Sequence, residues 1–375
     1  MTNVVEQAFW ELLKAGLWER QPMMEAKLSE EQWAEVIKHA KQQTLIGVLF
    51  DGMLKLPFEL HPNEETRMKW FWIVNKIERA NRLQNHVLVE FVMKLREKDV
   101  RALLLKGQSY AALYPNPLHR QCGDIDLYIG QKNYPKVCEW VKKCGMIGSK
   151  NVKNFHHQEI KWQGVNMDLH RVTIAFSTPS GYKRLIRWSE QMLANSQSFF
   201  TPSTEKEEIP IPEVSFNVFF VFIHLLKHFL YEGVGLRQLC DWARMLHVYH
   251  DKIDQEELKL NLKHYGLTHA WQVFGFLLVQ QIGLPQNEFP FYKNTQKKSA
   301  KILRVILQRG NFGHYAENQV SNNSNYLVRK TSNFFFHINC YLKGFCFFPS
   351  LAWEAFMFYL YQRIGPSFTD YFKNK

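Results

Sequence analysis

A run at residues 124–129, D-I-D-L-Y-I, constrains the fold most, because it alternates like a strand in a chain whose pattern is otherwise mostly helical. Side chains two apart on a strand point to the same face. Asp124 and Asp126 would therefore project together, while Ile125 and Leu127 face a core. The sequence predicts a small sheet around this run, with an acidic pair on one of its faces.

Further strands are predicted on either side of the run. Residues 102–105 form a short apolar segment, and residues 156–162 and 165–170 have strand-like alternation. The Gln163-Gly164 pair between the last two segments suits a hairpin turn. A mixed sheet is therefore expected within roughly residues 100–175.

Helices are predicted before and after this sheet. Residues 5–18 repeat apolar side chains at helical spacing, Ser29 is a suitable N-cap, and residues 64–98 fit one or two long amphipathic helices. From Tyr182 onward the pattern is almost wholly helical, apart from a proline-rich segment at residues 201–212. The predicted fold class is α+β, with a small mixed sheet embedded in predominantly helical N- and C-terminal regions.

The length of 375 residues exceeds what one ordinary core requires. We expect a helical region at 1–98 that packs on the core, a mixed α/β core at 99–200, and a helical domain at 213–375. The aromatic-rich stretch 334–361 is expected to form two core helices, with an interfacial membrane contact as the alternative. Polar residues interrupt it, so no stable membrane insertion is predicted.

The charge balance is basic, with 47 Lys and Arg against 35 Asp and Glu, which gives a formal net charge of +12. Such a surplus favours anionic partners, namely nucleotides, nucleic acid or a membrane surface, without selecting one. A basic helix face is expected either to be solvated or to bind a phosphate-rich acceptor; it comprises Lys293, Lys297, Lys301 and Arg304. The six cysteines form no C-x-x-C pair and the first residues lack a signal-peptide pattern, so a cytoplasmic protein with reduced thiols is expected.

The acidic pair indicates a cation site. Two adjacent carboxylates repel each other, so that without a cation one of them must hold a proton. Hard oxygen ligands suit Mg²⁺, which binds carboxylates together with substrate phosphates. Asp168 lies in a predicted strand about 40 residues on, and comes alongside Asp126 if the intervening helix crosses over. Three carboxylates would then hold two metal ions, as phosphoryl-type transfer requires.

Upstream of the pair, the K-G-Q-S segment at residues 106–109 lies where an apolar strand turns into a helix. Gly107 allows the backbone to approach a phosphate closely, and a helix start favours an anion. Ser109 would add a hydroxyl donor. Lys106 would add a positive charge, or else lie in solvent. Arg120 is expected to bind phosphate in a bidentate way, or else to cap a loop.

Histidines of the predicted sheet are expected to take no part in metal binding. His170 is placed on the strand face opposite Asp168, and the adjacent His156 and His157 are interpreted in the same way.

On the downstream helices, His224 and His228 stand one turn apart, a spacing that can bind zinc. Because no third ligand is near them in sequence, a core or capping role is expected. Lys227, Arg237 and Asp241 lie on helices that would close over the sheet. They are expected either to contact nucleotide or acceptor, or to form an internal network of salt bridges.

Taken together, K-G-x-S, Y-P-x-P-x-x-R, D-I-D-L and D-L-H resemble the motifs of the nucleotidyltransferase superfamily with the DNA polymerase β-like fold. More closely, they are similar to a bacterial group of uncharacterised nucleotidyltransferases, as are residues 224–228 and 235–241. One departure is Gln108, since the superfamily has serine directly after the glycine.

The resemblance implies roles for five residues. Gly107 and Ser109 would contact the triphosphate. Asp124 and Asp126 would bind two Mg²⁺ ions, with Mn²⁺ as the alternative. Asp168 would complete the metal site and help to activate the acceptor hydroxyl.

It also implies a reaction, in which a nucleoside monophosphate passes from a nucleoside triphosphate such as ATP to an acceptor hydroxyl, with release of pyrophosphate. The acceptor stays open between a tRNA, a protein, a sugar and a small molecule. Two other hypotheses remain. One is a non-catalytic nucleotide-binding or regulatory protein with the same fold, and the other is a basic interaction protein that docks on nucleic acid or a membrane surface.

Overall fold

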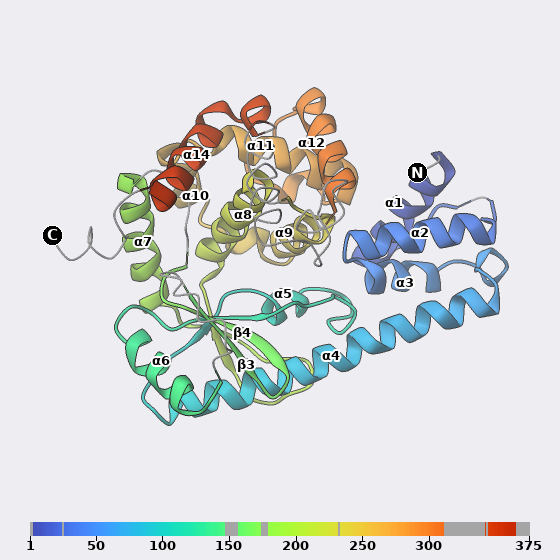
Figure 1. The fold of residues 1–375 in the computed structure, drawn as a ribbon. Coiled ribbons are helices and arrows are strands. Elements are labelled where there is room, and N and C mark those ends of the chain that lie inside the picture. Colours follow the sequence, from blue (N-terminus) through green and yellow to red (C-terminus); the bar gives the residue numbers. More distant parts are fainter. Residues whose placement is uncertain are drawn as a thin grey trace.

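A four-stranded sheet lies among helices from both ends of the chain (Figure 1). This computed structural model describes residues 3–24, 26–146, 157–173, 179–231, 233–310, 342 and 344–364. The strands are β1 Leu103–Leu104, β2 Ile125–Tyr128, β3 His157–Trp162, β4 Val165–His170, β5 Ser198–Phe200 and β6 Ile209–Ile211. The longer helices are α1 Asn3–Trp18, α2 Glu30–Gln42, α3 Ile46–Leu54, α4 Glu64–Arg96, α6 Tyr134–Lys143, α7 Pro179–Ala194, α8 Val214–Tyr231, α9 Leu236–Tyr249, α10 Gln255–His264, α11 Thr268–Leu277, α12 Gln296–Arg309 and α14 Pro349–Ile364, and α5 Gln108–Ala111 is a single turn. These elements confirm the predicted α+β class.

The sheet is mixed, with strand order β1-β2-β4-β3. β2 runs parallel to β4, whereas β1 and β3 pair antiparallel with β2 and β4. The predicted hairpin joins β3 to β4, and Gln163 and Gly164 both have positive φ angles, as a two-residue turn of this kind requires. The register places Asp126 opposite Asp168. The crossover that the sequence required for this pairing is therefore present.

One face of the sheet packs on α4 and α6. Ile125 and Leu127 of β2 and Met167 and Leu169 of β4 are buried there against the second half of α4 and one side of α6. Because side chains alternate along a strand, Asp126 and Asp168 lie on the other face. The apolar alternation of these strands therefore decides where the acids point.

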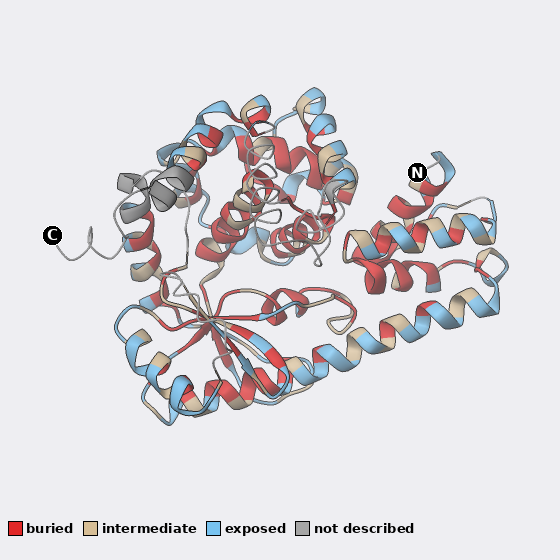
Figure 2. Ribbon diagram, in the orientation of Figure 1, coloured by how far each residue is buried: buried red, intermediate tan, exposed pale blue. Residues whose placement is uncertain are grey.

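A second and larger core joins the N-terminal helices to the C-terminal ones. α4 is one continuous helix that contributes to both cores, with Trp70 near its start in the larger core and Phe91 near its end in the core of the sheet. Between these ends exposed residues alternate with intermediate and buried ones (Figure 2). Ser29 caps α2 as predicted, in a reciprocal capping box with Gln32.

α8 is the central helix of the larger core. By length and composition it is apolar enough to cross a membrane, yet 67% of it is buried inside the protein, as in the core helix of a folded domain. α14 packs on the same core through buried residues such as Leu351 and Ala355, while Trp353 is exposed. Of the stretch predicted to form two aromatic helices, residues 334–341 and 343 lie outside the described residues.

A second sheet was not predicted. β5 and β6 form a two-stranded antiparallel ribbon at the edges of the proline-rich segment. Each strand has three residues, and Pro210 stands in the middle of β6. Strands this short, with a proline inside, have no periodicity that distinguishes them from a loop.

α1 and α3 cross at very short range through two glycines. A Cβ atom on Gly52 would overlap the carbonyl oxygen of Leu12, and one on Gly16 would overlap that of Val48. We expect Gly52→Ala to lower the free energy of unfolding by about 3 kcal/mol, the upper end for overpacking, because the obstacle is rigid backbone. Urea unfolding followed by circular dichroism measures this. Gly123→Ala is the control, because a Cβ there meets nothing within 4 Å; equal losses in both variants would contradict the prediction.

His119 ties the loop before β2 to the N-terminal helices. Its Nδ1 lies 2.6 Å from Asp51 Oδ1 and its Nε2 lies 2.8 Å from Glu78 Oε1. Burial alone would lower the pKa of His119, but the two carboxylates outweigh it and raise this pKa above 6.5. A raised histidine pKa stabilises the folded state fully below the unfolded value and loses this contribution as pH rises through the folded value.

The free energy of unfolding should therefore fall between pH 6 and pH 8.5, and His119→Gln should flatten this dependence. Urea titrations at the two pH values measure it, with His86→Gln as the control because His86 is largely exposed. An undiminished pH dependence in His119→Gln would assign the effect to other groups.

Candidate active site

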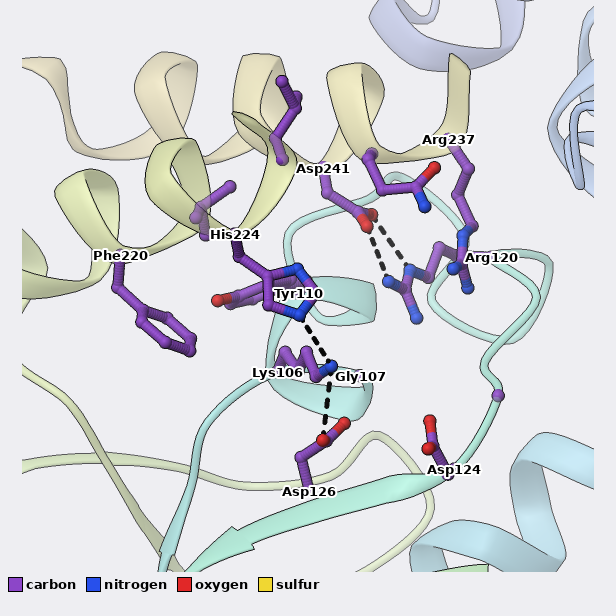
Figure 3. A pocket seen from close by; sticks show the side chains of 14 residues that line it. Lys106, Gly107, Tyr110, Arg120, Asp124, Asp126, Phe220, His224, Arg237 and Asp241 are labelled. Atoms are coloured by element: carbon purple, nitrogen blue, oxygen red, sulfur yellow. Dashed lines mark hydrogen bonds and ion pairs between the residues drawn. The ribbon is translucent and has the colours of Figure 1, made fainter. Parts of the chain in front are cut away.

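A cleft lies between the acidic face of the sheet and the helices α8 and α9 (Figure 3). Lys106, Gly107, Asp124 and Asp126 line it from the sheet side. Phe220 and His224 on α8, and Arg237 and Asp241 on α9, line it from the helical side. The space inside it that water molecules can enter is about 80 Å³, so the cleft is narrow.

Three carboxylates stand in one row across the sheet. Asp126 is opposite Asp168 on β4, and Asp168 is opposite Glu159 on β3. Asp126 is 2% exposed, whereas the side chain of Glu159 is 82% exposed. Asp124 precedes β2, is exposed, and points into the cleft (Figure 3). The structure thus brings the three predicted acids together, with Asp124 and Asp126 lining the cleft and Asp168 beside Asp126 on the neighbouring strand.

The charges of these acids are unequally compensated. Burial alone would raise the pKa of Asp126, but Lys106 and His170 lower it to about 2. Burial, followed by the charges of Asp126 and Asp124, raises the pKa of Asp168 to about 7. One acid of the cluster therefore holds a proton for part of the time near neutral pH, which is the conflict that a cation relieves.

Lys106 lies inside the cluster. Its Nζ is 3.2 Å from Asp126 Oδ1 and 3.1 Å from His224 Nε2 (Figure 3). Burial, and then the charge of Lys106, lower the pKa of His224 well below 6.5, so His224 is neutral and accepts a hydrogen bond from the lysine. His228 lies 3.2 Å from His224, and neither belongs to a group of three potential metal ligands among the described residues.

The turn after β1 carries Gly107, which has φ +78° and lines the cleft. A side chain at this angle would be strained, so the glycine is required by the backbone. Ser109 does not line the cleft; it is buried, and its Oγ has no hydrogen-bond partner among the described residues. α5 has only four residues, so its helix dipole would stabilise a phosphate at its N-terminus less than the sequence suggested.

Arg120 forms a buried salt bridge. Its Nε and Nη2 donate to the two oxygens of Asp241 at 3.0 and 2.6 Å, and the Tyr114 hydroxyl donates to the same carboxylate at 2.8 Å. Arg120 is 4% exposed. Arg120 thus binds the carboxylate of Asp241 in a bidentate way. For Asp241, this is the internal salt bridge that was expected as the alternative to a substrate contact.

Arg237 lies beside this pair with a less complete set of partners. Its Nη1 donates to the carbonyl oxygen of Gln121 at 2.8 Å, while its buried Nε has no hydrogen-bond partner among the described residues. Burial and the neighbouring charge of Arg120 lower its pKa, although the guanidinium stays charged at neutral pH. Lys227 is not among the residues that line the cleft.

The prediction for His170 was wrong. It is two residues from Asp168 on β4, so both side chains lie on one face, and its Nε2 is 2.8 Å from Asp126 Oδ1. His157 on β3 pairs with His170, and its Nε2 is 3.7 Å from Asp168 Oδ2. His156 lies outside the described residues. The two-residue spacing in D-L-H could have identified His170 as a neighbour of Asp168. His157 and Glu159 could be placed beside the site only once the register of the β3–β4 hairpin was known.

Comparisons with known proteins identify the family of the chain. The family described as "Uncharacterised nucleotidyltransferase" matches residues 29–282. No curated protein matches the chain. A solved structure, an antigenic nucleotidyltransferase-like protein from Paracoccidioides brasiliensis, is 11% identical, with the match covering 50% of this chain and 91% of that one. Its TM-score of 0.28 is too low to carry an argument about the fold. The family match spans more than half of the chain and includes the whole cleft, and the protein therefore belongs to this nucleotidyltransferase family.

Proposed function

We propose that the protein transfers a nucleoside monophosphate from a nucleoside triphosphate to an acceptor hydroxyl and releases pyrophosphate. The observation that supports this most is that Asp124 and Asp126 line a cleft together with Lys106, while Asp168 stands beside Asp126 on the neighbouring strand. In the reaction, the acceptor oxygen bonds to the α-phosphorus as the bond to the β-phosphate oxygen breaks. As a metal ligand, Asp168 would help to activate this hydroxyl.

The donor set fits a divalent cation. Ligand atoms of Asp126, Asp168 and His170 all lie within 4.8 Å of one another, and burial together with the neighbouring negative charges raises the pKa of Asp168. We propose two ions at these residues, magnesium or manganese, with Asp124 as a further ligand. When bound, they would neutralise phosphate charge and polarise the α-phosphate.

The remaining lining residues suit a triphosphate. Lys106 and the backbone of Gly107 lie next to the acids, and Arg237 offers a charged side chain with an uncommitted Nε. We propose that these groups bind the β- and γ-phosphates. Phe220 and Leu225 give α8 an apolar surface in the same cleft, against which a base can pack.

The acceptor is proposed only by its chemical class. A tRNA, a protein, a sugar and a small molecule are all compatible with the cleft, and a cytoplasmic location is expected. Lys297, Lys301 and Arg304 are exposed on α12, which keeps a phosphate-rich acceptor among the choices.

Incubation with each of the four labelled triphosphates, a divalent cation and a cell extract tests the proposal. We expect label in one molecular class, with pyrophosphate released in equal amount. Nucleotide binding without pyrophosphate would favour the non-catalytic hypothesis. Salt-sensitive binding to nucleic acid or vesicles that survives loss of all three acids would favour the interaction protein.

A further inference from the structure

The sheet register places two imidazoles beside the row of carboxylates. His170 is opposite Tyr128 on β2 and opposite His157 on β3, one step along from the row that Asp126, Asp168 and Glu159 form. The ring centroids of His157 and His170 are 5.3 Å apart. The acidic face of the sheet therefore offers nitrogen as well as oxygen donors.

Two donor sets can be distinguished on this face. The first contains Asp126, Asp168 and His170, and the second contains His157, Glu159 and Asp168. Within each set the ligand atoms lie within 4.8 Å of one another, and Asp168 is common to both. The first set is the more enclosed, since Asp126 is almost fully buried and the side chain of His170 is 15% exposed.

The imidazole nitrogen of the first donor set affects which metal ion this set prefers. Mg²⁺ prefers oxygen ligands in a near-ideal octahedron and gives up its waters reluctantly. Imidazole instead suits ions of the first transition row, and affinity for a mixed nitrogen and oxygen set rises along that row from Mn²⁺. Two carboxylates with one imidazole thus favour such an ion over Mg²⁺.

The hydrogen bonds of the cluster allow a metal ion to replace the proton that His170 donates to Asp126. Asp126 Oδ1 accepts from His170 at 2.8 Å and lies 3.2 Å from Lys106 Nζ. Lys106 also donates to the neutral His224, so it keeps a partner when a cation takes over the carboxylate. His170 can then turn from a donor to Asp126 into a ligand beside it.

We propose that His170 is a direct nitrogen ligand, with Asp126 and Asp168, of a first-row transition ion such as Mn²⁺, and that the site binds this ion more tightly than Mg²⁺. The role of that ion in nucleotidyl transfer rests on the proposed function. The binding of the ion by His170 does not rest on the proposed function, because it is measured without nucleotide.

The test uses the full-length, metal-stripped protein with slightly less than one equivalent of Mn²⁺. Electron spin echo envelope modulation detects the ¹⁴N coupling of an imidazole bound directly to Mn²⁺. We expect this coupling in the wild type, its loss in His170→Gln, and its retention in His157→Gln, a histidine on the neighbouring strand. Replacing a second-sphere partner already costs about 10–100-fold in metal affinity, so losing a ligand should weaken Mn²⁺ binding by about 100-fold.

A second variant covers the case in which His170→Gln does not fold. His170→Asp restores an all-oxygen set, and should bind Mn²⁺ without ¹⁴N coupling and with less preference over Mg²⁺. A wild type without ¹⁴N coupling, or coupling that persists in His170→Gln, would overturn the proposal and make His170 an orienting partner of Asp126. Coupling lost in His157→Gln alone would overturn it in favour of the second set.

These outcomes are separable from those for the reaction. Transfer activity in a protein that shows no ¹⁴N coupling would refute this inference alone. Coupling in a protein that transfers no label to any acceptor would support it while contradicting the proposed function.

Discussion

Asp126→Asn is expected to lower the rate of pyrophosphate release by about 10³-fold. Asp126 is the most buried acid of the cleft and contacts both Lys106 and His170. Under the proposed function its charge would hold a cation next to the phosphates. Metal stabilisation of the transition state contributes several kcal/mol, of which each 1.36 kcal/mol is a factor of ten. The shape of the side chain is kept, so the loss isolates its charge.

The stability of this variant has to be measured beside its activity. Because the pKa of Asp126 is depressed from 3.8 to about 2, its ionised form stabilises the folded protein above pH 4, and the contribution is lost as pH falls toward 2. Asparagine should therefore cost about 2 kcal/mol at neutral pH. Rates should be compared well below the unfolding temperature of the variant.

Glu139→Gln is the matched control for the amide replacement. Glu139 is exposed on α6 and pairs only with the neighbouring Lys143 among the described residues. It should keep both rate and stability. A rate for Asp126→Asn within tenfold of that control would contradict a metal role for Asp126.

Much of the sheet was predictable because its signals are local. The alternation of β2 and β4, the Gln163-Gly164 turn and the spacing of α6 are each contained within a few residues. Buried alternate residues also decided which face carries Asp126, since Ile125 and Leu127 needed a core. The parallel pairing of β2 with β4 followed from the same pattern and the helix between them.

The rest of the site depends on contacts between distant parts of the chain. The spacing of Arg120 from Asp124 suggested a phosphate contact, and Arg120 lines the cleft. The spacing did not show that α9 brings Asp241 to Arg120 from 121 residues away. Nor does the sequence show that Ser109 is buried outside the lining of the cleft, because this follows from where α5 packs. For His170 the sequence did contain the signal, since His170 is two residues from Asp168 and therefore lies on the same face of the strand. The prediction was wrong because it assigned His170 to the opposite face.

Asp241→Asn is expected to have the largest effect on stability. It removes the counter-charge of Arg120, which is 4% exposed, while Arg237 adds a second positive charge nearby. Breaking a buried ion pair by neutralising one partner costs about 3–5 kcal/mol, since the other charge stays buried without compensation. Urea unfolding followed by far-ultraviolet circular dichroism measures this loss.

A double variant separates the cost of an unpaired charge from the worth of the pair itself. Replacing both partners by apolar residues of similar volume, Arg120→Met with Asp241→Leu, should recover part of the stability lost in Asp241→Asn, because Arg120 no longer leaves a buried charge without its partner. The recovery is incomplete because Arg237 stays nearby without the carboxylate of Asp241. It should not recover pyrophosphate release, because the hydrogen bonds from Arg120 to Asp241, which link the loop before Asp124 to α9, are then absent. If the double variant is as unstable as Asp241→Asn, the packing of the pair matters more than its charge. If it is stable and fully active, the pair is only a structural link between α9 and the sheet.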